Sequence, residues 1–172
     1  MFVSYLSKKY MESEFRNAYF GAGCFWGIEE AFFKMEGVID TEVGYAGGED
    51  EEYSNPTYRQ VCSGETGHAE VVKVIFDPAE ISYDDLVYKF FEIHNPTQFN
   101  RQGPDYGSQY RSLVLYESSG ERAIVEKIIL ELKPSFERKI VTLVEPFEVF
   151  WKAEEYHQKY FMKNGGGSCR VI

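Results

Sequence analysis

The sequence predicts an α+β fold, a ferredoxin-like two-layer α/β sandwich with extra C-terminal helices and a glycine-rich tail. Three observations indicate it. Strand-like and helix-like segments follow the order βα-β-β-α-β, and a further helix, strand and helix come after them. The 172 residues are enough to bury one core, and neither an internal repeat nor a linker divides them. We therefore expect an N-terminal extension at residues 1–17 and a single domain at 18–172, whose flexible tail is 163–172.

The first half of this order comes from hydrophobic patterns that switch between the periods of a strand and a helix. Phe25, Ile28 and Phe32 recur at helical spacing, and Gly37 closes that pattern. Residues 46–57 are rich in glycine and acidic residues, which is typical of a solvated loop. The expected elements are a strand at 17–23, a helix at 25–35, a strand at 38–45, a short strand at 58–62 and a strand at 68–76.

The second half contains two signals for the start of a helix. Ser82 with Asp85, and Ser118 with Glu121, have the spacing of a capping box. Residues 95–110 contain prolines and glycines, and an irregular loop of that length in a compact domain is usually functional or disordered. The remaining expected elements are a helix after residue 82, a strand at 111–116, a helix from 118 to 132, a strand at 140–147 and a helix at 152–162.

Composition excludes several classes of protein. The formal charge of 18 − 28 = −10 argues against a nucleic-acid or anionic-membrane partner. The sequence contains no run of 18 apolar residues, which is the length a helix needs to span a membrane. Residues 1–17 lack the apolar core of a secretory signal. The cysteines, Cys24, Cys62 and Cys169, match neither a disulfide framework nor zinc spacing. We expect a cytoplasmic monomer with no metal and no cofactor.

Cys24 lies where a predicted strand gives way to a helix, within the run Gly-Ala-Gly-Cys-Phe-Trp-Gly at 21–27. The backbone N–H groups and the positive dipole end of a first helical turn favour a thiolate over a thiol. Phe25 and Trp26 offer apolar surface to a substrate. Many cysteines are simply buried, but the glycines on both sides and the helix start favour a reactive sulfur beside an apolar pocket.

Four further segments combine polar groups with loop positions. They are Asn-Pro-Thr-Tyr-Arg at 55–59, Thr-Gly-His-Ala-Glu at 66–70, Gly-Pro-Asp-Tyr-Gly-Ser-Gln-Tyr-Arg at 103–111, and Cys169 in a glycine-rich tail. Together with the cysteine motif, these segments resemble the A-type methionine sulfoxide reductase family, the peptide-methionine (S)-S-oxide reductases. The resemblance runs from about residue 19 to residue 169, and its motifs are highly specific in combination.

The resemblance implies a catalytic role for five residues. Cys24 matches the nucleophile and Glu70 the proton-donating carboxylate. Tyr58 and Tyr110 match the tyrosines that hydrogen-bond the sulfoxide oxygen, and Cys169 matches the resolving cysteine. The general chemistry agrees, because a sulfoxide oxygen leaves only when it is protonated. A thiolate and an acid with a raised pKa must therefore meet at one place.

The resemblance also implies the substrate and the cycle. Phe25 and Trp26 match the pocket for the S-methyl group, and Asp105 matches a further polar residue of the site. The expected substrate is the S epimer of methionine sulfoxide, free or in oxidised proteins, so the function would be repair of oxidative damage. A Cys24 sulfenic acid would become a Cys24–Cys169 disulfide, reduced by thioredoxin. Many members have a second tail cysteine; here none follows Cys169.

Several alternatives stay open on the residues alone. Glu70 on a strand would by default face solvent, and Tyr58 and Tyr110 would be packing residues. We interpret Cys62 as a buried, inert thiol. His68 with Glu70 gives the His-x-Glu of a zinc deaminase, but the Pro-Cys-x-x-Cys that completes such a site is absent.

The other two histidines are also given structural roles. We interpret His94 and His157 as surface or helix-end residues, and His68 as a turn residue or one that supports the site. Two rival functions remain. A thiol hydrolase would pair Cys24 with a histidine and have no use for Cys169. An aromatic-pocket binding module would need no reactive thiolate.

Overall fold

The computed structural model describes residues 14–166, which form a mixed α+β fold around one curved sheet. The strands of this sheet are β1 (Arg16–Ala22), β2 (Val38–Ala46), β3 (Ala69–Phe76), β6 (Ser112–Tyr116), β7 (Leu143–Pro146) and β8 (Phe150–Lys152). Their spatial order is β7-β6-β1-β3-β2-β8. A separate hairpin pairs β4 (Arg101–Gln102) with β5 (Asp105–Tyr106). The helices are α1 (Phe25–Phe33), α2 (Tyr58–Cys62), α3 (Tyr83–Glu92), α4 (Ser119–Leu132) and α5 (Tyr160–Lys163).

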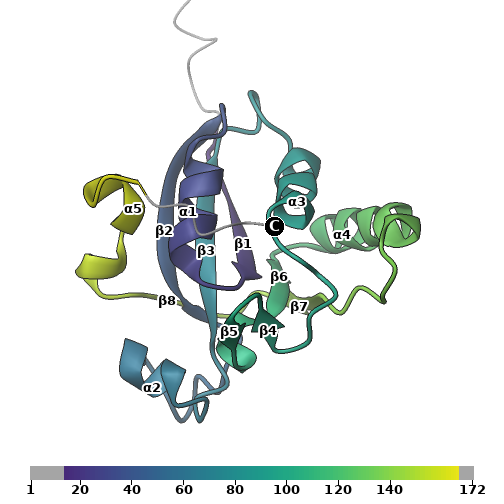
Figure 1. Cartoon of the computed structure of the whole chain (residues 1–172). Coiled ribbons are helices and arrows are strands. Elements are labelled where there is room, and N and C mark those ends of the chain that lie inside the picture. The colour runs from purple at the N-terminus through teal and green to yellow at the C-terminus, as the bar shows by residue number, and fades with distance from the viewer. Residues whose placement is uncertain (1–13, 167–172) are drawn as a thin grey trace, which may run out of the picture.

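One face of the sheet carries the main core beneath α1 and α3 (Figure 1). β1 pairs antiparallel with β3 on one side and with β6 on the other. Phe20, at the centre of β1, is fully buried and stacks on Phe32 of α1 and Phe90 of α3, with ring centroids 4.9 and 5.3 Å apart. Because side chains alternate across a strand, the even-numbered residues of β1 and β3 point to this helix-covered face.

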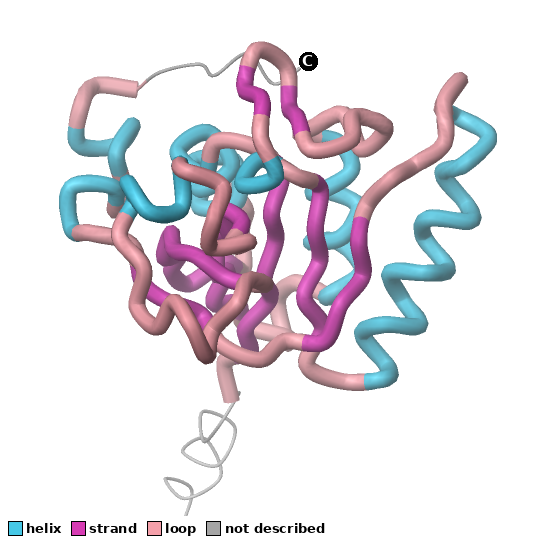
Figure 2. Tube along the Cα trace, turned by 90° about the horizontal axis from the view of Figure 1, so that it is seen from below, coloured by secondary structure: helices cyan, strands magenta, loops and turns pink. Residues whose placement is uncertain are grey.

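The opposite face is closed by the sheet itself. A flat sheet of six strands would be about 24 Å wide, yet only residues 147–149 connect β7 at one edge to β8 at the other. Such a connection spans at most about 14 Å, so the sheet must curl until its edges approach each other. Phe147 in this connection stacks on Tyr19 of β1 at 4.1 Å. α4 lies along one flank, where it is the long helix in Figure 2.

Most of the expected elements are present, with small shifts of their ends. The Ser82–Asp85 pair forms a complete capping box at the start of α3. At α4 the box is incomplete: the Ser118 side chain accepts from the Glu121 N–H, but the Glu121 carboxylate accepts from the Glu117 N–H instead of the Ser118 N–H. The expected strand at 140–147 shortens to β7.

Two expectations about secondary structure are wrong. Residues 58–62 form helix α2 rather than a strand, because Thr57 and Gln60 make a capping box that opens the helix. Residues 152–162 are not one helix. A 3₁₀ turn covers Glu155–His157, and Lys159 then takes the left-handed conformation with φ of 56°, which ends helical continuity before α5. Residues 1–13 of the N-terminal extension and residues 167–172 of the tail, including Cys169, lie outside the described residues.

Candidate active site

Cys24 occupies the residue directly before α1, where β1 turns sharply into the helix. Gly23 makes this turn with φ of +94°, and a Cβ there would lie 2.7 Å from side-chain atoms of Gln102. Only glycine fits both conditions. The turn leaves Cys24 half-buried at the positive end of the α1 dipole, as the sequence predicted.

Glu70 lies beside Cys24 on the helix-covered face of β3 and is 2% exposed. Its Oε2 accepts a 2.9 Å hydrogen bond from the backbone N–H of Phe25, the residue after the cysteine. Burial raises the pKa of Glu70 to about 8; the Phe25 N–H opposes that rise and the charge of Asp105 adds to it. The carboxyl is therefore mostly protonated at neutral pH. The default interpretation of Glu70 as a solvent-facing residue is wrong.

Tyr58 and Tyr110 both lie near this acid. Each is half-buried, and the pKa of each hydroxyl is raised mainly by burial, that of Tyr110 to about 12 and that of Tyr58 well above its usual range. The charge of Glu70 acts on both hydroxyls, and that of Cys24 acts on Tyr110. Two hydroxyls that keep their protons thus stand near the carboxyl, and that of Tyr110 also stands near the sulfur of Cys24. Asp105 lies within electrostatic range of Glu70 and Tyr110.

The β4–β5 hairpin holds Asp105 at the site. Asp105 pairs with Gln102 across the hairpin, and the side chain of Gln102 packs against Gly23. The Gln102 amide is fixed in turn by two hydrogen bonds of 3.1 Å to the backbone N–H and C=O of Asn95. The irregular segment 95–110 therefore has a definite function in the fold, which is to brace the turn that presents Cys24.

The two aromatic residues after the cysteine differ in exposure. Phe25 is 1% exposed, and its ring lies 5.2 Å from the ring of His157 inside the core. Trp26 is half-buried and stacks on Tyr160 of α5, with centroids 3.7 Å apart. The indole N–H of Trp26 donates to Nδ1 of His157 at 3.0 Å. Of the two aromatics predicted to line the pocket, Trp26 is the one with accessible surface.

Sequence reasoning missed three residues that surround the site. His157 is fully buried rather than on the surface, and Tyr45 is buried too. Glu154 accepts hydrogen bonds from the hydroxyl of Tyr45 and the backbone N–H of Tyr58. No local pattern could reveal these contacts, because the partners are about 100 positions apart. Cys62 is exposed, not buried, and its sulfur is hydrogen-bonded by the Tyr58 hydroxyl.

The remaining histidines have structural partners. His68 bonds Asp50 through Nε2 at 2.9 Å, so it does not form a ligand pair with Glu70. His94 is buried rather than on the surface; its two ring nitrogens lie 2.6 and 2.7 Å from the Phe90 carbonyl and the Ser112 hydroxyl. Burial lowers the pKa of His94 to about 4. Among residues 14–166, no group of three or more His, Cys, Asp or Glu could hold a metal ion, and no helix could cross a membrane.

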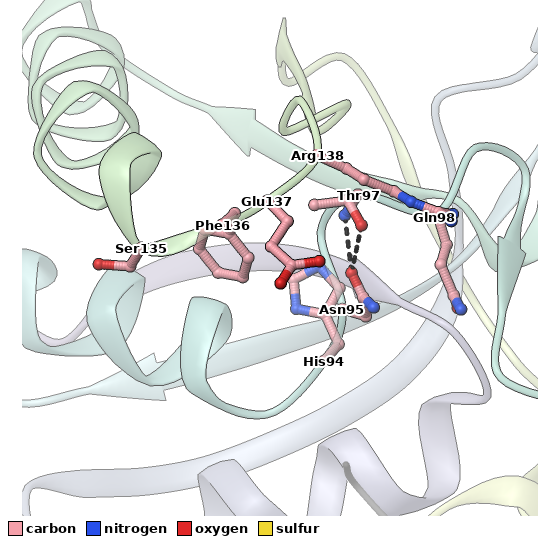
Figure 3. Close-up of a pocket in the computed structure, with 8 residues that line it drawn as sticks. All are labelled: His94, Asn95, Thr97, Gln98, Ser135, Phe136, Glu137 and Arg138. Atoms are coloured by element: carbon pink, nitrogen blue, oxygen red, sulfur yellow. Dashed lines mark hydrogen bonds between the residues drawn. The ribbon is translucent and has the colours of Figure 1, made fainter.

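A polar cavity of about 440 Å³ lies between residues 94–98 and 135–138 (Figure 3). Within it, the Asn95 side chain accepts hydrogen bonds from the backbone N–H and the hydroxyl of Thr97. None of the predicted site residues lines this cavity. The cavity is therefore separate from the predicted catalytic residues around Cys24 and Glu70.

A sulfur at a helix start, next to a carboxyl that stays protonated at neutral pH, suits an enzyme of the cysteine-dependent oxidoreductase class. The family comparison is specific: residues 16–172 match the family model described as peptide methionine sulfoxide reductase. The chain therefore belongs to this family. Its curated relatives are A-type members, and the chain is an enzyme of that type.

Relatives in sequence and structure span nearly the whole chain. The MsrA protein of Methanoculleus marisnigri is 51% identical over 94% of this chain and 98% of its own length. That of Methanothermobacter thermautotrophicus is 53% identical over 93% and 94%. The reduced form of Mxr1 from Saccharomyces cerevisiae superposes with a TM-score of 0.86 at 40% identity, covering 91% of this chain and 90% of that one. Methionine sulfoxide reductase A of Corynebacterium diphtheriae gives 0.81 at 38% identity, covering 93% and 80%.

Proposed function

We propose that the chain is a peptide-methionine (S)-S-oxide reductase that reduces methionine sulfoxide, free or in oxidised proteins. The observation that supports this function best is the contact between Glu70 and the N–H of Phe25 at 2.9 Å. The contact fixes the position of the Glu70 carboxyl beside Cys24, and burial raises its pKa to about 8, which keeps it mostly protonated. A sulfoxide needs both groups at once, because its oxygen is a poor leaving group until a proton reaches it.

The proposed chemistry uses two thiols for each sulfoxide. The Cys24 thiolate attacks the substrate sulfur while Glu70 protonates the oxygen, which joins the two sulfurs. The hydroxyl then passes to the Cys24 sulfur as the bond between the sulfurs breaks, so methionine leaves and Cys24 becomes a sulfenic acid. The Cys169 thiol then condenses with that sulfenic acid, which forms the Cys24–Cys169 disulfide and releases water. In balance, one sulfoxide is reduced to a thioether, two thiols are oxidised to one disulfide, and the oxygen leaves as water.

Stereochemistry follows from two contacts with the substrate, together with the fixed position of Cys24. Tyr58 and Tyr110 would bind the oxygen, while Trp26 with Phe25 behind it would receive the methyl group. A chiral sulfur held by its oxygen and its methyl presents only one epimer to Cys24, and membership of the family implies the S epimer. Asp105 would add a polar contact at the hairpin side of the site.

We propose thioredoxin as the reductant of the disulfide. The structure of Mxr1 from Saccharomyces cerevisiae in complex with Trx2 resembles this chain with a TM-score of 0.61 at 28% identity, over 87% of this chain and 86% of that one. A dithiol protein reduces a disulfide by attack on one of its sulfurs. The disulfide would then have to be presented by the tail that carries Cys169.

The remaining proposals concern the setting of the enzyme. We propose a monomer that acts in the cytoplasm in repair of oxidative damage, with a single catalytic domain at 18–172. The central strand order β6-β1-β3-β2, with α1 and α3 on one face, supports the description of the core as ferredoxin-like. A thiol hydrolase has less support, since Nδ1 of the nearby His157 is already occupied by Trp26.

One experiment tests the function and its rivals together. The fully reduced protein is mixed with one equivalent of racemic methionine sulfoxide, and thiols, methionine and the remaining epimers are measured. We expect two thiols lost per methionine formed, consumption of the S epimer only, and a mass-mapped Cys24–Cys169 disulfide. No methionine would refute the reductase. A Cys24–Cys62 disulfide with Cys169 still reduced would refute the assigned resolving cysteine.

A further inference from the structure

We propose that Glu154 is a positioning residue that holds the oxygen-binding and methyl-binding sides of the substrate pocket in one fixed arrangement. The inference rests on the proposed function, since that function gives Tyr58 and Trp26 their roles. Glu154 lies in the segment between β8 and α5, with its side chain about one-third exposed. Hydrogen bonds link its carboxylate to the oxygen-binding side of the pocket, and a longer polar contact of 3.6 Å brings it close to His157 on the methyl-binding side.

The first link runs to the oxygen-binding side. Oε1 of Glu154 accepts from the backbone N–H of Tyr58 at 3.1 Å and from the hydroxyl of Tyr45 at 3.4 Å. The Tyr58 N–H is the first of helix α2 and has no partner within the helix. A carboxylate at this end also interacts favourably with the helix dipole. The Thr57–Gln60 capping box opens α2, and Glu154 ties its first residue, Tyr58, to the segment after β8.

The second link runs to the methyl-binding side through His157. An indole N–H can only donate, so Nδ1 of His157 must accept from Trp26, and the proton of the neutral imidazole is on Nε2. Burial keeps the pKa of His157 below its usual value, which favours this neutral form. Nε2 is buried, has no hydrogen-bond partner among residues 14–166, and lies 3.6 Å from Oε2 of Glu154. Oε2 accepts a 3.1 Å hydrogen bond from the Tyr156 hydroxyl, so its contact with His157 is one of charge and packing, which places a negative charge beside the buried Nε2–H.

The two links converge on one packed unit. The ring of His157 lies 4.6 Å from that of Tyr58 and 5.7 Å from that of Trp26, so one imidazole separates the two substrate-binding residues. The segment that carries Glu154 is anchored independently. Gln158 bonds the N–H and C=O of Val43 on β2, both at 2.9 Å. Because its segment is anchored to β2, Glu154 can hold both sides of the pocket in fixed positions relative to the sheet.

The test compares Glu154→Ala and Glu154→Gln in single-turnover reduction of methionine sulfoxide at varied substrate concentration. In Glu154→Ala we expect about a tenfold loss of the apparent second-order rate constant, the size of one lost hydrogen bond to a charged group. The loss should fall on half-saturation rather than on the saturated rate. Glu154→Gln should recover part of it, because its amide oxygen can still accept from Tyr58. Alkylation of Cys24 by iodoacetamide should be unchanged in both.

Glu155→Ala is the matched control, since it removes a neighbouring exposed carboxylate and should behave like the wild type. A second readout works even if the alanine variant does not fold. The chain has two tryptophans, so ¹H–¹⁵N spectra give two indole signals, assigned with Trp151→Phe. Glu154→Gln should shift the signal of Trp26 and leave that of Trp151 in place.

The outcomes separate this inference from the function on which it rests. If the wild type reduces methionine sulfoxide but Glu154→Ala does so within twofold of its rate constant, the positioning role is refuted. An unshifted Trp26 signal in Glu154→Gln also refutes it. A third outcome is that Glu154→Ala loses activity while its Cys24 is alkylated faster by a similar factor. That result would mean a general loosening of the fold, and it would overturn the proposal too. If the wild type yields no methionine, the proposed function itself has failed.

Discussion

The reacting groups and the recognition groups of this site are held in different ways. Cys24 lies in the turn that follows β1, and Glu70 lies on β3, the strand that pairs with β1. One hydrogen bond, from the Phe25 N–H at the start of α1 to the Glu70 carboxyl, connects the two. Their geometry is therefore set by sheet register and core packing. Trp26 and Tyr58 depend instead on a segment near the C-terminal end of the described chain, which contacts them through His157 and Glu154.

This difference has a physical consequence. Register in a sheet with a buried face is strongly specified, since a slip of one residue would move Glu70 to the other face. The recognition side is held by a few hydrogen bonds, each worth about 1 kcal/mol. We expect changes in the first region to stop the chemistry. Changes in the second should mainly weaken substrate binding.

The largest effect should come from Cys24→Ser. A serine hydroxyl at the same helix start is a far weaker nucleophile at neutral pH than a thiolate, and it cannot form a sulfenic acid. We expect complete loss of methionine formation with the fold intact, measured by single-turnover chromatography and circular dichroism. Turnover above a few per cent of the wild type would show that Cys24 is not the nucleophile.

Glu70→Gln should have the next largest effect. Glutamine keeps the shape and can still accept from the Phe25 N–H, but it has no proton to transfer. We expect a loss on the order of 10²–10⁴ in the chemical step, typical of a positioned acid. The wild-type rate should also fall as pH rises through about 8, where Glu70 loses its proton. That limb of the stopped-flow pH profile should be missing in Glu70→Gln; a fast variant would assign the proton to another group.

Trp26→Phe should have a smaller effect, since it leaves the reacting groups untouched. The variant loses the hydrogen bond to His157 and part of the stack on Tyr160. We expect about a tenfold rise in half-saturation with methionine sulfoxide and little change in the saturated rate. Trp151→Phe is the control, because its indole bonds Asp50 instead. Equal effects of the two substitutions would contradict a specific role for Trp26.

The same contrast explains which parts of the molecule could be predicted from the sequence. The cysteine turn was predictable because its signals are local: Gly23, Cys24 and the helical period after them. Helix α2 also had a local signal, Thr57 and Gln60 at capping-box spacing. A segment of only five residues with a β-branched and an aromatic residue still resembles a strand, so the cap was the better guide.

Other features had no local signal at all. β3 has apolar residues on both faces, so its pattern could not tell which face Glu70 would occupy. The burial of His157 depends on Trp26, 131 positions away. The break before α5 depends on Glu29 of α1, which accepts from the backbone N–H of Lys159 at 2.8 Å. Such features arise only when the sheet brings distant segments together.

The last prediction concerns stability instead of activity, and it tests whether Glu70 is held as an acid by the fold itself. The folded pKa of about 8 lies above the ordinary value of 4.5. Between these two values the native state binds a proton that the unfolded state has lost, so the free energy of unfolding should decrease as pH rises. This contribution is fully present below about pH 4.5 and is lost by the time pH exceeds 8. Glu70→Gln cannot titrate, so its stability should not show this decrease.

The measurement is urea unfolding of both proteins at several pH values from 5 to 9, because the difference between them cancels every other titrating group. The wild type should lose stability relative to Glu70→Gln from pH 5 to about 8 and change little between pH 8 and 9. The buried acid that the reaction needs would then also lower the free energy of unfolding as pH rises, so function would reduce stability in this region. A difference independent of pH would mean that Glu70 ionises normally, and the acid role would have to be given to another group.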